Sequence, residues 1–369
     1  MKEHNVTEIS ANHSPHSDAS LAREYGSNFS YPWRRISGGL VALTIISILS
    51  VSLGSVHIPS TAVLEILSNK VFFIDTHYTW PTSWETIIWD LRLPRIVLAG
   101  TVGMALAMSG ASYQGLFRNP LADPYLIGVA SGAGLGASIV MLSSIPIYVA
   151  GLNLLPISAF MGGIIAITSA FLIARQYDQI PLTGLILAGV AIASFCGAAT
   201  SLIMLKSNPE LRPILSWLLG GFINAQWKNI AIILPYVVPS IAVILIHGRI
   251  LNLLHLEEKQ AKQLGVHVER TKLILILSST LATAAAVSFC GLIGFVGLVS
   301  PHLVRLVWGN DYRFLLPMSG IVGAIFLISA DLLARTVISP TEIPVGLITA
   351  FVGAPFFLYL LKRNRRISI

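Results

Sequence analysis

Charged residues are scarce in this sequence. Only 11% of its 369 residues are Asp, Glu, Lys or Arg, whereas 54% are hydrophobic. Soluble domains carry about 25% charged residues, so this balance excludes an ordinary soluble protein. Helices satisfy their own backbone hydrogen bonds and therefore suit the interior of a bilayer. The composition predicts an all-α integral membrane protein.

Acidic side chains are missing from the middle of every long apolar run. Asp178 and Asp331 come closest, and each lies at the end of a run. Proton-coupled carriers usually keep a carboxylate inside the bundle as a proton relay. Its absence argues against that class, whereas an ion-coupled secondary carrier with a Na⁺ site of backbone carbonyls stays open.

The chain also lacks the motifs of a motor or an enzyme. None of its lysines follows a glycine, so the phosphate-binding pattern G-x-x-x-x-G-K-[ST] is missing. The metalloprotease pattern H-E-x-x-H is missing too, and no nucleophile–base pair is recognisable. We expect no catalytic residue, and uphill transport would need energy from a separate subunit.

Only two cysteines occur, Cys196 and Cys290, and both lie inside apolar runs. Free cysteines in such surroundings behave as small buried hydrophobic residues. The sequence therefore predicts neither a disulfide framework nor a metal site.

Apolar segments long enough to cross a bilayer dominate what remains. A helix needs about 20 apolar residues to cross ~30 Å of hydrocarbon. Two overlong runs are divided, one at Pro146–Pro156 and the other at Gly291–Gly297. The ten predicted spans are 38–55, 94–115, 125–145, 156–174, 182–205, 229–247, 272–290, 294–308, 314–331 and 343–361. Segment 213–227 is short and broken by two glycines, so we expect an interfacial or re-entrant helix there.

Basic residues indicate the orientation. An even number of spans puts both termini on one side of the membrane. With cytoplasmic termini, 17 of the Lys and Arg residues fall in inner segments and seven in outer ones, as the positive-inside rule requires. The net charge of +7 therefore reports topology and does not point to nucleic acid. We expect a disordered polar tail over 1–35, a transmembrane domain over 36–361 and a basic cytoplasmic C-terminus over 362–369.

One short stretch, "HLEEKQAKQL" (255–264), is strongly polar. Leu253, Leu256, Ala261 and Leu264 recur near helical spacing, which indicates a short cytoplasmic helix. Glu258 and Lys262 form a favourable i,i+4 pair, and Gly265 is typical of a helix stop. So short a helix is marginal alone in water. It needs support from its own membrane domain or from a soluble partner.

Glycines and two sharp breaks complete the pattern. Small residues at short spacing let helices approach closely in lipid. They occur at Gly100, Gly103 and Gly110, at Gly128, Gly132, Gly134 and Gly136, and at Gly291, Gly294 and Gly297. Breaks follow apolar runs at "RNPLADP" (118–124) and "GLIGFVGLVSPH" (291–302), which hints at an internal repeat.

These stretches together resemble a known family. The matching text includes "LRLPRIVLAGTVGMALAMSGASYQGLFRNPLADPYLIGVASGAGLGA" (91–137), "GLIGFVGLVSPHLVRLVWGNDYRFLLP" (291–317) and "EIPVGLITAFVGAPFFLYLL" (342–361). It is similar to FecCD permeases of type II ATP-binding-cassette (ABC) importers, which serve ferric siderophores, haem and cobalamin. The resemblance covers about 90 to 361, and segment 56–89 departs from the usual length.

The resemblance implies partners as well as a fold. It implies a homodimer, or a dimer with a close paralogue, of ten-helix protomers in the cytoplasmic membrane of a bacterium. It also implies two cytoplasmic ATPase subunits, which bind ATP and Mg²⁺, and an extracytoplasmic substrate-binding protein. Ferric siderophore is the first expectation for the substrate, with haem and cobalamin as alternatives. The permease itself would hold no cofactor.

The resemblance also assigns roles to individual residues. The ATPase-coupling helix would comprise Leu256, Glu257, Glu258, Ala261, Leu264 and Gly265. Asn119 and Leu121 match the cytoplasmic gate, with Thr183 opposite. Arg92, Arg95 and Arg335 match the residues that dock the binding protein, and these arginines lie at outer span ends against the positive-inside rule. Interfacial snorkelling is the alternative explanation for them.

Overall fold

The fold is described from a computed structural model. It describes residues 32–54, 58–72, 80–143, 146–149, 152–176, 180–206, 211–255 and 258–365. The predicted tail over 1–35 therefore lies almost wholly outside the described residues, and so does the end of the C-terminal segment.

The described chain is a bundle of helices with one hairpin, which has two strands of two residues each. Its first half contains α2 (Trp33–Ser52), α3 (Ser60–Phe72), α4 (Thr82–Thr86), the π-helix η1 (Ile87–Arg92), α5 (Leu93–Phe117), the 3₁₀ turn η2 (Pro124–Ile127), α6 (Val129–Leu142), β1 (Tyr148–Val149), β2 (Leu152–Asn153) and α7 (Leu154–Ala174). Its second half contains α8 (Leu182–Lys206), α9 (Leu211–Leu218), α10 (Trp227–Ile246), α11 (Gly248–Leu254), α12 (Glu258–Gln263), α13 (Val268–Cys290), α14 (Val296–Trp308), α15 (Tyr312–Thr336) and α16 (Val345–Arg365).

All ten predicted spans coincide with helices. Among the described residues, seven helices are long and apolar enough to cross a membrane. The other three predicted spans are the shorter apolar helices Val129–Leu142, Val296–Trp308 and Val345–Leu360. The all-α membrane fold predicted from composition is thus confirmed.

Helix α5 forms the centre of the bundle, where it packs against α13, α14 and α15. Glycines make these contacts possible, because a Cβ on Gly103 would clash with the backbone of Gly323 and one on Gly110 with that of Gly297. Gly132 of α6 meets Gly162 of α7 in the same way. The predicted close packing through small residues is confirmed.

The two predicted breaks meet inside the bundle. Tyr125 of η2 donates its hydroxyl to the carbonyl of Ile293 over 3.1 Å, just before α14 begins. Helix α9 is also short, and Gly221 after it donates its N–H to Cys290 over 2.8 Å. These contacts satisfy backbone groups that interrupted helices would otherwise leave unpaired within a membrane.

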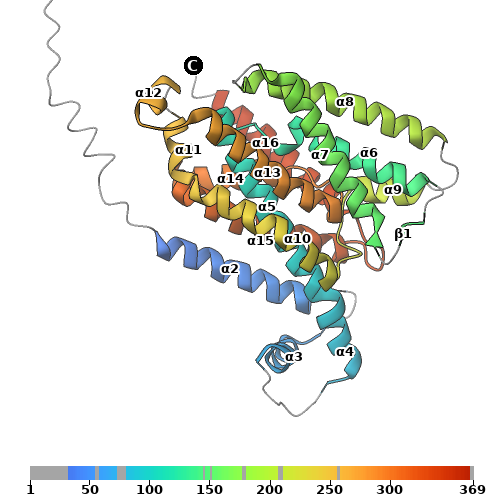
Figure 1. The fold of residues 1–369 in the computed structure, drawn as a ribbon. Coiled ribbons are helices and arrows are strands. Elements are labelled where there is room, and N and C mark those ends of the chain that lie inside the picture. Colours follow the sequence, from blue (N-terminus) through green and yellow to red (C-terminus); the bar gives the residue numbers. More distant parts are fainter. Residues whose placement is uncertain are drawn as a thin grey trace, which may run out of the picture.

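Short helices lie at opposite ends of the molecule. Figure 1 shows α12 at one end of the bundle and α3 with α4 at the other. We call these the α12 end and the α3 end. The outer segment 56–89, whose length departs from the resembled family, thus includes α3, α4 and the start of η1.

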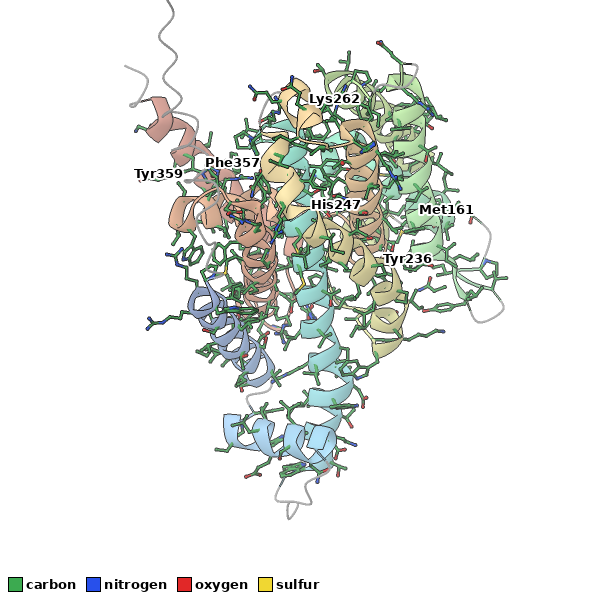
Figure 2. The ribbon with its side chains drawn as sticks, turned by 60° about the vertical axis from the view of Figure 1, so that its left-hand side comes forward. Met161, Tyr236, His247, Lys262, Phe357 and Tyr359 are labelled. Carbon is green, nitrogen blue, oxygen red and sulfur yellow. The ribbon has the colours of Figure 1, made fainter. Side chains whose placement is uncertain are left out.

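The sides of the bundle between these ends are apolar. Figure 2 shows side chains along the sides of the bundle, among them Met161 and Tyr236, while Lys262 lies at the α12 end. Met161 is 48% exposed and Tyr236 43%. A broad apolar surface of this kind suits contact with lipid.

Candidate coupling and gate site

Helix α12 rests on its own chain through one face and leaves another face open. Ala261 is fully buried, whereas Leu264 just beyond the helix is 60% exposed. The helix stops where predicted, because Gly265 takes a left-handed φ of 84° and Val266 donates its N–H to Ala261 O over 3.1 Å. Leu256 and Glu257 lie outside the described residues, and Glu258 is the first residue of the helix.

The predicted gate loop follows α5 at the α12 end. The loop starts at Arg118, whose φ of 50° turns the chain away from the helix. Asn119 then accepts the N–H of Leu121 on its side-chain oxygen over 2.9 Å. Asp123 accepts the N–H of Tyr125 over 2.8 Å and starts η2. These local bonds hold Asn119 and Leu121 exposed at the tip, with Leu121 at 48%.

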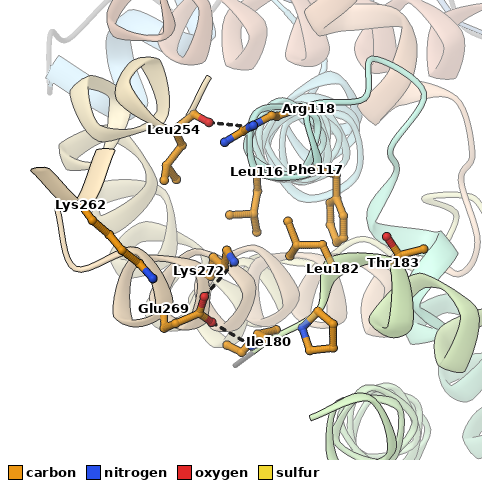
Figure 3. Close-up of a pocket in the computed structure, with 11 residues that line it drawn as sticks. Leu116, Phe117, Arg118, Ile180, Leu182, Thr183, Leu254, Lys262, Glu269 and Lys272 are labelled. Atoms are coloured by element: carbon orange, nitrogen blue, oxygen red, sulfur yellow. Dashed lines mark hydrogen bonds and ion pairs between the residues drawn. The ribbon is translucent and has the colours of Figure 1, made fainter. Parts of the chain in front are cut away.

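Thr183 lies in the first turn of α8, close to the same loop. It lines a hollow of about 390 Å³ together with Leu116, Phe117 and Arg118 from the end of α5. Lys262 of α12 contributes to the same hollow (Figure 3). The structure therefore brings the start of the gate loop, Thr183 and the predicted coupling helix around one hollow. Asn119 and Leu121 lie outside that lining.

Two hydrogen bonds at this hollow were not foreseen from the sequence. Arg118 donates from Nε to the carbonyl of Leu254 over 2.7 Å. Ile180 donates its N–H to Glu269 Oε2 over 2.8 Å, and Glu269 Oε1 accepts from Lys272 over 2.9 Å. Figure 3 shows both links on either side of the hollow. No sequence signal joins these residues, because they lie 136 and 89 positions apart.

A second hollow, of about 1080 Å³, is also lined by Arg118. Among the described residues, its lining includes Arg118, Arg249, Arg305 and Arg313 but only one carboxylate, Asp311. Burial lowers the pKa of His255 in this lining, and the nearby Arg305 and Arg118 lower it further. The α12 end is thus strongly basic, as the positive-inside rule expects of a cytoplasmic face.

Asp311 organises this basic hollow. It starts α15 by accepting the N–H of Arg313 over 3.0 Å and also accepts from Asn252 of α11 over 2.8 Å. Burial raises its pKa, but hydrogen bonds from Arg313 and Asn252 outweigh burial and leave the pKa below its usual value. Asp311 therefore links α11 to α15 as a carboxylate.

The three arginines predicted to dock a binding protein lie at the α3 end, but they are buried. Arg92 is 6% exposed, and Arg95 and Arg335 are each 8% exposed. Arg92 donates to Ser52 O over 3.0 Å, and Arg335 donates to Ser50 O over 3.0 Å. Arg92 and Arg335 therefore bind backbone groups of their own chain and do not extend into solvent. The docking role stays a prediction.

Comparison with known proteins identifies the family. The model of the FecCD transport family matches residues 42–363. The chain belongs to the FecCD transport family. One relative is the cobalamin import system permease protein BtuC of Halobacterium salinarum, 47% identical over 76% of this chain and 75% of that protein. Another is the hemin transport system permease protein HmuU of Yersinia pestis, 43% identical over 78% of this chain and 87% of that protein.

A solved structure supports the same assignment. An inward-facing metal-chelate type ABC transporter aligns with a TM-score of 0.77 and 31% identity, covering 89% of this chain and 99% of its own. Membership of the FecCD family confirms the resemblance inferred from the sequence motifs. The chain is a transport permease with a FecCD fold.

Proposed function

We propose that this FecCD permease is the membrane-spanning subunit of an ABC importer for a metal chelate. The observation behind this proposal is the family match over residues 42–363. The chain holds no phosphate-binding loop, so ATP and Mg²⁺ would bind two separate ATPase subunits. An extracytoplasmic binding protein would deliver the substrate. In this proposal the protein lies in the inner membrane, the α12 end faces the cytoplasm, and both termini are cytoplasmic.

Helix α12 is the proposed contact with the ATPase. Its buried Ala261 holds it against the bundle, while Leu264 leaves apolar surface open to a soluble partner. We expect Leu264→Ala to reduce co-purification of the ATPase without changing the melting temperature. Ala261→Leu should lower the melting temperature, because the added side chain has no room in a packed core. If Leu264→Ala lowered the melting temperature but left ATPase assembly complete, α12 would not be the ATPase contact.

The proposed translocation path runs between two copies of the permease. Helix α8 carries Thr183 of the proposed gate, and its exposed apolar residues, such as Leu187, 72% exposed, and Phe195, 69% exposed, suit contact with lipid as well as with a second copy. The gate would be formed by Asn119 and Leu121 of one loop with Thr183 of α8. All three are exposed at the α12 end. A homodimer repeats this gate across its two-fold axis.

The proposed substrate is an iron-siderophore-type chelate. Relatives are named for cobalamin and hemin, and a structural relative is of the metal-chelate type. All of these are large metal chelates, so haem and cobalamin are the alternatives within the same family. Mass spectrometry of the ligand bound to the purified cognate binding protein distinguishes these three substrates. A ligand that contains no metal chelate would overturn the substrate class.

A further inference from the structure

The predicted coupling segment is flanked by two polar links to the predicted gate. Helix α11 ends at Leu254, before α12, and α13 begins at Val268, after α12. Leu254 O accepts from Arg118, and Glu269 accepts from Ile180. The two ends of the coupling segment are therefore each bonded to a different gate segment.

The link before α12 reaches the gate loop. Arg118 immediately precedes Asn119, and its guanidinium spans to the last residue of α11 over 2.7 Å. The donor is charged and the acceptor is a backbone carbonyl, which makes this a charge-assisted hydrogen bond. A shift of α11 therefore pulls directly on the start of the loop that holds Asn119 and Leu121.

The link after α12 reaches the start of α8. Ile180 lies three residues before Thr183, and its N–H bonds to Glu269 in the first turn of α13. Lys272, only 5% exposed, holds the other oxygen of Glu269 at 2.9 Å. The carboxylate is fixed from both sides, so its bond to Ile180 has a defined direction.

Helix α12 faces one of the gate residues, Thr183, across a hollow. The hollow of about 390 Å³ lies between Lys262 of α12 and Thr183 of α8, as Figure 3 shows. Helix α12 packs instead on α11 and α13. Its motion therefore reaches the gate through its two flanking helices, where Arg118 and Glu269 make their bonds.

We propose that Arg118 and Glu269 are positioning residues that transmit motion of the coupling helix to the two halves of the gate. Arg118 acts on the loop of Asn119 and Leu121, and Glu269 acts on Thr183 through Ile180. This proposal rests on the proposed function, because it takes α12 as the ATPase contact. It assigns roles to two residues that neither the coupling helix nor the gate itself includes.

The test uses the assembled complex in proteoliposomes with variants chosen to keep the fold. Glu269→Ala removes the acceptor for Ile180, whereas Glu269→Gln keeps a carbonyl oxygen for it. Arg118→Asn tolerates the left-handed backbone at φ 50° but is too short to reach Leu254. Exposed Arg270, next to Glu269, gives the matched control Arg270→Ala.

Transport per ATP hydrolysed is the first readout. We expect Glu269→Ala and Arg118→Asn to lower it by about five-fold or more, the usual lower range of allosteric coupling. Arg270→Ala should stay near the unaltered complex, and ATPase assembly should persist. Glu269→Gln should fall between the unaltered complex and Glu269→Ala, because it keeps an acceptor for Ile180 but loses the ion pair with Lys272. Full coupling in Glu269→Ala would overturn the role of Glu269. If ATPase assembly and the melting temperature fell in parallel with transport, the role of these residues would be purely structural.

A second readout does not depend on the chelate. Spin labels on exposed Gln263 of α12 and Leu187 of α8 report whether the two helices move together when a non-hydrolysable ATP analogue binds. We expect a constant distance in the unaltered complex and a changed distance in Glu269→Ala. If the distance between the labels responded in the same way in the unaltered complex and in Glu269→Ala, the proposal would be overturned. A complex that couples these helices but takes up no chelate would contradict only the proposed substrate.

Discussion

Arg95 and Asp331 form an ion pair that is closed to solvent at the α3 end. Arg95 Nε donates to Asp331 Oδ1 over 2.9 Å, and the Asp331 side chain is 1% exposed. Arg335 lies 3.1 Å from the other Asp331 oxygen, and Arg95 also pairs with Glu342 at 2.9 Å. One carboxylate on α15 thus joins α5 to α15, and Arg335 extends the network to α2 through Ser50.

Removing Asp331 should strongly destabilise the permease. Asp331→Ala would leave Arg95 and Arg335 buried without their shared carboxylate, and breaking a buried pair in this way costs about 3–5 kcal/mol. Thermal unfolding of the detergent-solubilised protein measures the loss. Glu342→Gln is the matched control, because Glu342 is 32% exposed and such a pair contributes about 0–1 kcal/mol. Equal melting temperatures for both variants would contradict the structural role of Asp331.

The docking prediction for the outer arginines can be separated from this structural role. Arg335→Glu places a second carboxylate beside Asp331, so we expect a large fall in melting temperature. The docking role predicts slower association of the binding protein with the folded fraction, whereas a purely structural role of Arg335, which is only 8% exposed, predicts an unchanged rate. Slower association, restored by reversing an acidic charge on the binding protein, would instead establish docking at Arg335.

Asp311 should make stability at the α12 end depend on pH. Its folded pKa is lowered, so its contribution is fully present above the ordinary unfolded value of about 3.9 and is lost as the pH falls through the folded pKa. Asp311→Ala should cost about 1 kcal/mol at neutral pH, as for other helix caps. Melting temperatures at neutral and acid pH check this, with exposed Asp90→Ala as the control. If Asp311→Ala were still destabilised to the same extent at a pH below the folded pKa of Asp311, this pH dependence would be contradicted.

Leu121 should limit passive leakage through the gate. Its side chain is 48% exposed at the tip of the loop after α5, where Asn119 fixes the backbone. Leu121→Ala shortens the side chain, so preloaded chelate should escape from proteoliposomes in the absence of ATP. Leu306→Ala, on an exposed position of α14, is the control. An unchanged leak with normal uptake would mean that Leu121 is no gate residue.

Hydrophobic length was enough to predict the ten span helices of this fold, but not the short helices α3, α4 and α11. All ten spans correspond to helices because a bilayer forces apolar segments of fixed length to satisfy their own backbone. The glycine contacts were also foreseeable, since Gly110 and Gly297 belong to small-residue patterns at helical spacing. The stop of α12 at Gly265 follows from the left-handed conformation that glycine alone adopts freely.

Long-range polar pairing was not predictable. Arg95 and Asp331 lie 236 positions apart, so the sequence suggested exposed docking arginines where the fold buries them. Nothing in the sequence singles out Glu269, and only the tertiary structure shows its bond to Ile180. Side-chain partners of this kind depend on helix packing, which periodicity alone does not encode.

The energy source of uptake tests the proposed function most directly. The permease would be reconstituted with its ATPase and binding protein, and chelate uptake measured with ATP, without ATP, and with an imposed proton or Na⁺ gradient alone. We expect uptake only with hydrolysable ATP, because the described spans hold no proton-relay carboxylate in mid-span and the sequence has no phosphate-binding loop. Uptake driven by an ion gradient in the absence of the ATPase would contradict an ABC permease and establish a secondary carrier.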